Sequence, residues 1–135
     1  MLTSYIALDV GRVRIGVAVA NDVARIAAAL PFVSNDESFK DRLQQLITEH
    51  DAAAVIVGWP RGLNGQETEQ TQYVNQFVDE LETWVKVPVH LQDEAGTSLK
   101  AEEELKRRGV AYEKGDIDSL SAVYILEDFL AEGVH

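Results

Sequence analysis

Two short apolar runs on either side of an acidic turn constrain the fold of this chain most. The runs are Ile6–Leu8 and Ile15–Val19, and they flank Asp9, Val10 and Gly11. Apolar runs of this length bounded by glycine are typical of buried strands, and two of them close together predict a β-hairpin. Asp9 then ends a strand that is otherwise buried. A carboxylate there is costly unless an arginine pairs with it or it binds a cation, and this stretch alone leaves both open.

Hydrophobic periodicity predicts alternating helices and strands in the rest of the chain. The third strand is expected to end at Pro31, and the first helix is expected to begin at Ser34–Asp36. Such an order is typical of a mixed sheet with helices on both faces, where sites gather at the carboxyl ends of strands. The further predicted strands cover residues 25–30, 53–57 and 87–91, and the predicted helices cover 36–50, 66–84, about 98–109 and 115 to about 130.

Composition limits the class of protein. The chain has 135 residues, of which 46% are hydrophobic, so we expect a single domain over residues 1–135. No apolar run approaches the roughly 20 residues of a membrane span, and no targeting segment or cysteine is present, so a cytoplasmic protein without a membrane partner is expected. The net charge of −11 argues against a protein that coats nucleic acid, although carboxylates that hold cations contribute to that sum.

Acidic residues fall at three points where the predicted sheet would converge. Asp9 ends the first strand, Asp93 and Glu94 follow the strand at 87–91, and Asp118 lies near the start of the last helix. Carboxylates without a fixed basic partner repel one another, so such a site is most stable when it holds a cation, and oxygen ligands suit Mg²⁺ or Mn²⁺. Simpler explanations exist, because Asp118 could cap its helix and the acidic pair could be solvated loop residues.

Four motifs in order resemble the YqgF (RuvX) family. Its members are described as pre-16S rRNA nucleases and as Holliday junction resolvases, and they have an RNase H-like fold. The resemblance runs from near residue 4 to near residue 130. The motifs are Asp9–Ala18, Val57–Pro60 with Asn64–Gly65, Asp93–Glu94 followed by Thr97, Ser98 and Ala101, and Asp118–Ala122.

The resemblance implies an RNase H-like α/β fold with a five-stranded mixed sheet, in which the first three strands are antiparallel and helices cover both faces. It also implies that Asp9, Glu94 and Asp118 are active-site residues that bind divalent metal, with Asp93 only their neighbour. The expected activity is a metal-dependent endonuclease, with Mg²⁺ or Mn²⁺ in a two-metal site. The favoured substrate is the 5′ end of pre-16S rRNA, with possible association with ribosomal particles, and branched DNA is the alternative. The oligomeric state stays open.

Some positions depart from the family pattern. Val13 stands where a basic residue is usual, Ala95 stands where an arginine usually follows the acidic pair, and Trp59 replaces a common leucine. The absent arginine weakens the case for phosphate contacts near the site. The remaining candidates for phosphate binding are Arg14, Arg61 and Lys114, whereas a solvated helix end is expected at Lys106, Arg107 and Arg108.

Two other functions fit parts of the sequence. Asp9 and Gly11 in a hairpin resemble the first phosphate loop of actin-like kinases and chaperone ATPases, but those proteins need two such domains and no second Asp-x-Gly hairpin occurs here. A non-catalytic acidic domain that docks on ribosomal or other proteins would fit the charge and Ala95. Metal binding separates the alternatives, since a scaffold should bind Mn²⁺ poorly.

Overall fold

The computed structural model describes residues 2–62, 64–94 and 97–132, so Ala95 lies outside the described residues. Within these ranges, five strands and four helices follow one another in the order β1-β2-β3-α1-β4-α2-β5-α3-α4. The strands are β1 (Ser4–Val10), β2 (Arg14–Asn21), β3 (Ala28–Ser34), β4 (Ala52–Pro60) and β5 (Val89–Glu94). The helices are α1 (Phe39–His50), α2 (Glu69–Trp84), α3 (Thr97–Arg108) and α4 (Lys114–Ala131).

The strands form one mixed sheet in the order β3-β2-β1-β4-β5. β2 is antiparallel to both β1 and β3, whereas β4 is parallel to both β1 and β5. The Gly11 N–H donates to the Arg14 carbonyl at 2.9 Å and closes the β1–β2 hairpin. The predicted five-stranded mixed sheet, with its first three strands antiparallel, is confirmed.

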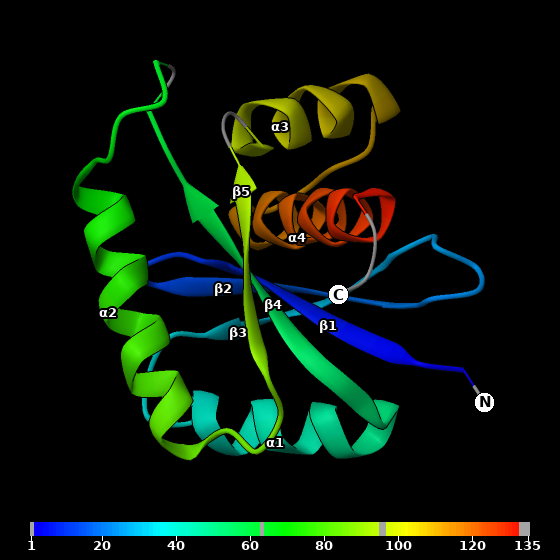
Figure 1. The fold of residues 1–135 in the computed structure, drawn as a ribbon. Coiled ribbons are helices and arrows are strands. Elements are labelled where there is room, and N and C mark those ends of the chain that lie inside the picture. The colour runs from blue at the N-terminus through cyan, green and yellow to red at the C-terminus, as the bar shows by residue number, and fades with distance from the viewer. Residues whose placement is uncertain (1, 63, 95–96, 133–135) are drawn as a thin grey trace.

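Helices cover both faces of the sheet, as predicted: α1 and α2 lie on one face, and α3 and α4 lie on the other (Figure 1). Side chains alternate between the faces along a strand, so β1 is apolar on both sides. Ile6, Leu8 and Val10 pack on the α1/α2 face, while Tyr5 and Ala7 pack on the α3/α4 face. Asp9 continues the second series and therefore points toward α4.

Several predicted boundaries were wrong: β3 begins at Ala28 instead of residue 25, α2 begins at Glu69 instead of residue 66, and three further differences have a clear physical reason. β3 runs through Pro31 instead of ending there, which an edge strand permits because one row of its backbone groups has no partner strand. α1 begins at Phe39, because the Asp36 carboxylate accepts hydrogen bonds from the backbone N–H and the hydroxyl of Ser38 and turns the chain first. β5 continues to Glu94, which ends a strand and does not lie in a loop.

In the residues described, no helix is both long enough and apolar enough to cross a membrane.

Candidate active site

A glycine beside Asp9 brings the last helix to the sheet. Asp9 on β1 pairs in register with Gly16 on β2, and residues directly opposite in an antiparallel pair share a face. A Cβ on Gly16 would clash with the carbonyl of Asp118 and with the N–H of Ser119. The missing side chain therefore allows the backbone of α4 to approach the sheet, and it sets Asp118 beside Asp9.

Asp118 does not cap its helix, contrary to the simpler explanation of this residue. Glu113 is the N-cap of α4, and Asp116 completes a capping box with it. Asp118 lies in the next turn, where its Oδ2 is 3.8 Å from the Arg14 Nε. That distance is too long for a hydrogen bond, and the Arg14 Nε is buried without any acceptor among the described residues.

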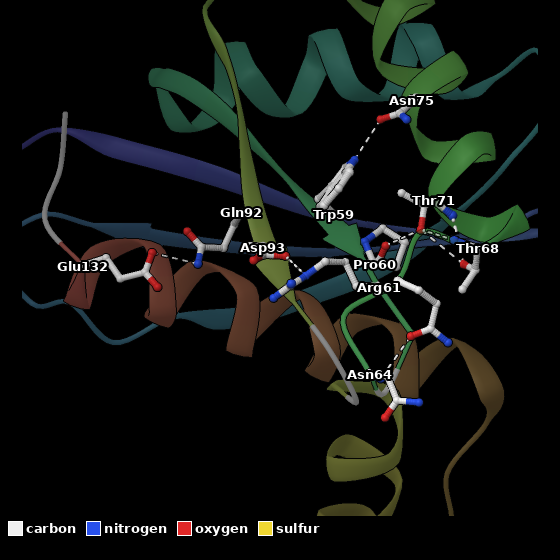
Figure 2. A network of polar contacts seen from close by, with 11 residues as sticks. Trp59, Pro60, Arg61, Asn64, Thr68, Thr71, Asn75, Gln92, Asp93 and Glu132 are labelled. Carbon is white, nitrogen blue, oxygen red and sulfur yellow. Dashed lines mark hydrogen bonds and ion pairs between the residues drawn. The ribbon is translucent and has the colours of Figure 1, made fainter.

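Glu94 reaches the same helix from β5, an edge strand of the sheet, on the same face as Asp9. Its side chain is buried and lies against Asp128 and Glu132 of α4. Gln92, two residues earlier on the same face of β5, donates to the Glu132 carboxylate at 2.9 Å (Figure 2). The Glu94 Oε1 atom has no hydrogen-bond partner among the described residues, so a buried acceptor is left unsatisfied.

Asp9, Glu94 and Asp118 all line one cavity of about 350 Å³. Its walls come from the ends of β1, β4 and β5, from α2 and α3, and from α4. The cavity thus joins the three acids that the sequence singled out, although Asp9 lies more than 80 residues before the other two along the chain. The other lining residues are Val10, Gly11, Gly58, Pro60, Arg61, Gln70, Val74, Leu99 and Ile125.

The three carboxylates are electrostatically unfavourable without a cation. Burial, with the nearby charge of Asp118, raises the pKa of Asp9 to about 7. Burial, with the hydrogen bond and charge of Asp128, raises the pKa of Glu94 to about 9. Burial also raises the pKa of Asp118, against the opposing effect of Arg14 and Lys114. Ionised carboxylates held this way favour a bound cation.

The side chains of the described residues are not arranged as a complete metal-binding site. Among the residues with described placement, no group of three His, Cys, Asp or Glu side chains is spaced to hold one ion. The contact of Glu94 with Asp128 is consistent with this. The donor chemistry nevertheless fits Mg²⁺ or Mn²⁺, because the candidate ligands are all carboxylate oxygens and the Glu94 Oε1 is free to accept.

Arg61 lines the cavity, and Asp93, which does not, pairs with it. Consecutive strand residues point to opposite faces, so Asp93 turns away from Glu94. The Asp93 Oδ1 forms an ion pair with the Arg61 Nε at 2.5 Å (Figure 2), and the Arg61 N–H donates to the Glu94 carbonyl at 3.1 Å. Arg61 is therefore held between the ends of β4 and β5, where it also lines the cavity.

Other residues singled out in the sequence lie elsewhere. The Trp59 Nε1 donates to the Asn75 Oδ1 at 2.8 Å, and its ring packs against the core (Figure 2). Lys114 is exposed at the start of α4. The solvated helix end predicted in α3 is confirmed, because its basic residues pair with acids of the same helix: Lys106 with Glu102, and Arg107 and Arg108 with Glu104.

The sequence pattern missed several neighbours of the site. Gly16 could have been found from the hairpin itself. It lies as many residues after the turn as Asp9 lies before it, and residues at equal distances from the turn pair with each other. No local signal identifies Asp128, since only tertiary packing brings it to Glu94. Gln70, whose Nε2 donates to the Val10 carbonyl at 2.8 Å, looks like an ordinary helix residue in the sequence.

Comparison with known proteins gives the same family as the motifs. The family model RuvX, described as "Holliday junction resolvase", matches residues 3–132. A protein of Sulfurihydrogenibium sp. named "Putative pre-16S rRNA nuclease" is 35% identical over 131 residues, which cover 96% of this chain and 90% of that protein. A protein of Chloroflexus aurantiacus with the same name is 37% identical over 129 residues, covering 93% and 84%.

Two solved structures share the fold. RuvC from T. thermophilus in complex with a Holliday junction substrate aligns with a TM-score of 0.53 at 16% identity, covering 97% of this chain and 96% of that chain. The Fowlpox virus resolvase in complex with Holliday junction DNA aligns with a TM-score of 0.52 at 9% identity, covering 100% of both chains. At such identities the likeness concerns architecture, and it confirms the predicted RNase H-like fold.

Proposed function

This chain belongs to the RuvX (YqgF) family, and on that basis we propose that it is a metal-dependent endonuclease that hydrolyses phosphodiester bonds. The observation that carries the proposal is the convergence of Asp9, Glu94 and Asp118 on one cavity. Buried acids with raised pKa values that line a cleft mark a functional site more often than a structural one.

Asp9, Glu94 and Asp118 are the residues that would hold the metal. They come from β1, β5 and α4, so each is fixed by a different rigid element of the fold. Two divalent ions, Mg²⁺ or Mn²⁺, would supply an activated water for attack on phosphorus and stabilise the departing oxygen. The unsatisfied Glu94 Oε1 and the repulsion between Asp9 and Asp118 are the features that support this ligand set.

Basic residues around the cavity would position the phosphates of the substrate. Arg14 has a buried Nε with no acceptor in the part of the chain that the structure describes, and it lies on the same side as Asp118. Arg61 lines the cavity itself, but it would exchange part of its contact with Asp93 for a phosphate oxygen. Lys114 is exposed at the start of α4, within the electrostatic range of Asp118. Arginine suits this role because it can bind a phosphate through two donors.

We favour RNA as the substrate, in the maturation of the 5′ end of pre-16S rRNA in the cytoplasm, where the enzyme would act on ribosomal precursor particles. The names of the relatives at 35% and 37% identity support this choice. Branched DNA is the second candidate, because the matching family model is described as a Holliday junction resolvase.

Cleavage of two labelled substrates tests the proposal. A pre-rRNA-like RNA and a four-way DNA junction are each incubated with EDTA, Mg²⁺ or Mn²⁺, beside the Glu94→Gln variant as a control for contaminating nucleases. We expect cleavage that requires metal and is lost in Glu94→Gln, with RNA cut faster than the junction. Absence of cutting together with absence of Mn²⁺ binding by calorimetry would overturn the proposal in favour of a non-catalytic acidic interaction domain.

A further inference from the structure

A second cavity, of about 700 Å³, lies on the other face of the sheet from the acidic one. It is formed where the start of α1 meets the C-terminal half of α2 (Figure 1). Four aromatic residues line it, so we call it the aromatic groove: Phe39, Tyr73, Phe77 and Trp84. Phe39 is buried and joins the groove to the core, while the other three rings are partly exposed.

The aromatic rings of the groove attract cations. The Arg12 guanidinium lies 4.5 Å from the centre of the Tyr73 ring, and the Lys40 ammonium lies 5.5 Å from the centre of the Trp84 ring. Both cations come from the chain itself, and Lys40 is exposed. Contacts of this kind at exposed positions are worth about 0.5–1 kcal/mol, so an incoming cation can replace Lys40 over Trp84.

The charge of the groove also favours a cation. Its lining holds three exposed carboxylates, Asp36, Glu37 and Glu80, against the ammonium of Lys40, a net charge of −2 that becomes −1 when the Arg12 guanidinium over Tyr73 is counted. Hydrogen bonds from Ser38 lower the pKa of Asp36 and keep it ionised. The last turn of α2 carries no basic residue, so its free carbonyls add to the negative potential. A phosphate backbone would be repelled here.

One side chain connects the groove to the acidic cavity. The Asn35 Nδ2 donates to the Tyr73 hydroxyl at 2.8 Å and to the Gly11 carbonyl at 2.8 Å. Gly11 lines the acidic cavity two residues after Asp9. An occupant that contacts Tyr73 would therefore touch the same hydrogen-bond network that holds the hairpin turn beside the cavity.

We propose that the aromatic groove binds a Lys- or Arg-rich segment of a partner protein. A basic side chain would lie over Trp84 in place of Lys40 and pair with Glu37 or Glu80. The α1/α2 face would then take a basic protein and leave the α3/α4 face, with the acidic cavity, open. The net charge of −11 on the whole chain favours encounter with such a partner. This inference does not depend on nuclease activity.

Titration with a basic peptide, followed by amide NMR, tests the inference. The probe is a capped hexapeptide of alternating Lys and Arg, and the comparison peptide replaces each by Gln. The groove variant is Glu37→Gln with Glu80→Gln, and the control is Glu49→Gln with Glu103→Gln, which removes the same charge from exposed positions outside the groove. We expect shift changes centred on Tyr73, Phe77 and Trp84.

The dissociation constant should rise roughly fivefold in the groove variant and stay unchanged in the control. An equal rise in both variants would mean that the acidic chain attracts polycations without a site, and it would overturn the inference. Equal binding of the Gln peptide would overturn it as well, because the groove would then be an apolar patch that does not select cations. All four substituted residues are exposed, so the variants should fold like the parent chain.

Discussion

The two faces of the sheet are packed with side chains of different size, and only one of them carries the carboxylates. On the α1/α2 face, β1 presents Ile6, Leu8 and Val10, which meet buried leucines of the helices. On the α3/α4 face, the central strands present alanines, and Asp9 follows Ala7 in the same series. Large side chains keep a helix at a distance and supply apolar burial, whereas small ones let α4 approach the sheet closely.

Because of this difference, one face of the sheet contributes mainly to stability and the other carries the candidate active site. The α1/α2 face buries more large aliphatic side chains, and none of the three cavity acids belongs to it. The α3/α4 face accepts buried carboxylates with raised pKa values, which cost stability in the absence of a cation. If the comparison holds, substitutions on the first face should lower the free energy of unfolding and spare activity, while substitutions of acids on the second should do the reverse.

The largest loss of stability is expected for Leu43→Ala in α1. Leu43 is 1% exposed, and its truncation leaves a cavity under the α1/α2 face. The free energy of unfolding should fall by about 3 kcal/mol in urea denaturation. The cleavage rate, measured well below the unfolding temperature, should stay within about twofold of the parent. Leu91→Ala, at a residue that is 49% exposed, is the control and should lose much less. An equal loss at both positions would contradict the comparison.

A smaller loss of stability, with a loss of activity, is expected for Gly16→Ala. The new methyl would meet the backbone of Asp118, which cannot give way without moving α4. We expect about 2 kcal/mol of destabilisation and at least about a tenfold slower cleavage, because Asp118 would shift from Asp9.

Gly58→Ala is the matched control for this substitution. Its methyl would meet the Cδ1 and Cγ1 atoms of the buried Ile125 side chain and no backbone atom, so the destabilisation should be smaller than that of Gly16→Ala. Parent-like cleavage by a folded Gly16→Ala protein would show that the close approach of α4 to the sheet serves packing alone.

The hairpin and the first acid could be predicted because their signal is local. Apolar runs around Gly11 predict the turn, and the turn places Asp9 near the end of a buried strand, although β1 continues one residue further, to Val10. The contacts of Glu94 could not be predicted in the same way. Whether Glu94 ends a strand or begins a loop depends on pairing with Pro60, and its contact with Asp128 depends on how α4 crosses the sheet. Both depend on tertiary packing, which cannot be recognised from the residues adjacent in the sequence.

The boundary errors have a similar origin. The capping signal at Asp36 predicts that α1 begins there. In the structure the Asp36 carboxylate instead accepts a hydrogen bond from the Ser38 N–H in a turn that precedes the helix. β3 was predicted to stop at Pro31, yet an edge strand tolerates proline. Local propensity therefore predicts that each helix or strand exists. The residues at which it begins and ends depend on which neighbouring groups complete the hydrogen bonds of its backbone.

Asp9→Asn should raise stability in metal-free buffer, and the gain should depend on pH. The pKa of Asp9 is about 7 in the folded protein, against an ordinary value of 3.8. Between these values the folded state binds more protons than the unfolded state, so the parent loses stability as pH rises from about 4 to 7. At pH 8 in EDTA the variant should be more stable by on the order of 2 kcal/mol, while cleavage is abolished.

Thermal unfolding across this pH range, with and without Mg²⁺, checks the sign of the effect. Addition of Mg²⁺ should stabilise the parent at pH 8 and leave the variant nearly unchanged, because the added cation removes the repulsion only where Asp9 is ionised. A parent whose stability rises between pH 4 and 7 in EDTA, with Asp9→Asn showing the same rise, would mean that this carboxylate is not strained by its surroundings.

The smallest changes in stability are expected for substitutions of two arginines on the α3/α4 side. Arg14→Ala and Arg108→Ala each remove an ion pair longer than 3.5 Å, with Asp118 at 3.8 Å and with Glu104 at 3.7 Å, so each should change stability by no more than about 0.5 kcal/mol. Of these two arginines, only Arg14 has a buried Nε that lacks an acceptor among the described residues. Steady-state kinetics should therefore show about a tenfold rise in KM for Arg14→Ala and none for Arg108→Ala, since a phosphate contact is lost only in the first. If the two variants cleave alike, Arg14 only balances the charge of Asp118, and the phosphate would have to be bound by Arg61 or Lys114.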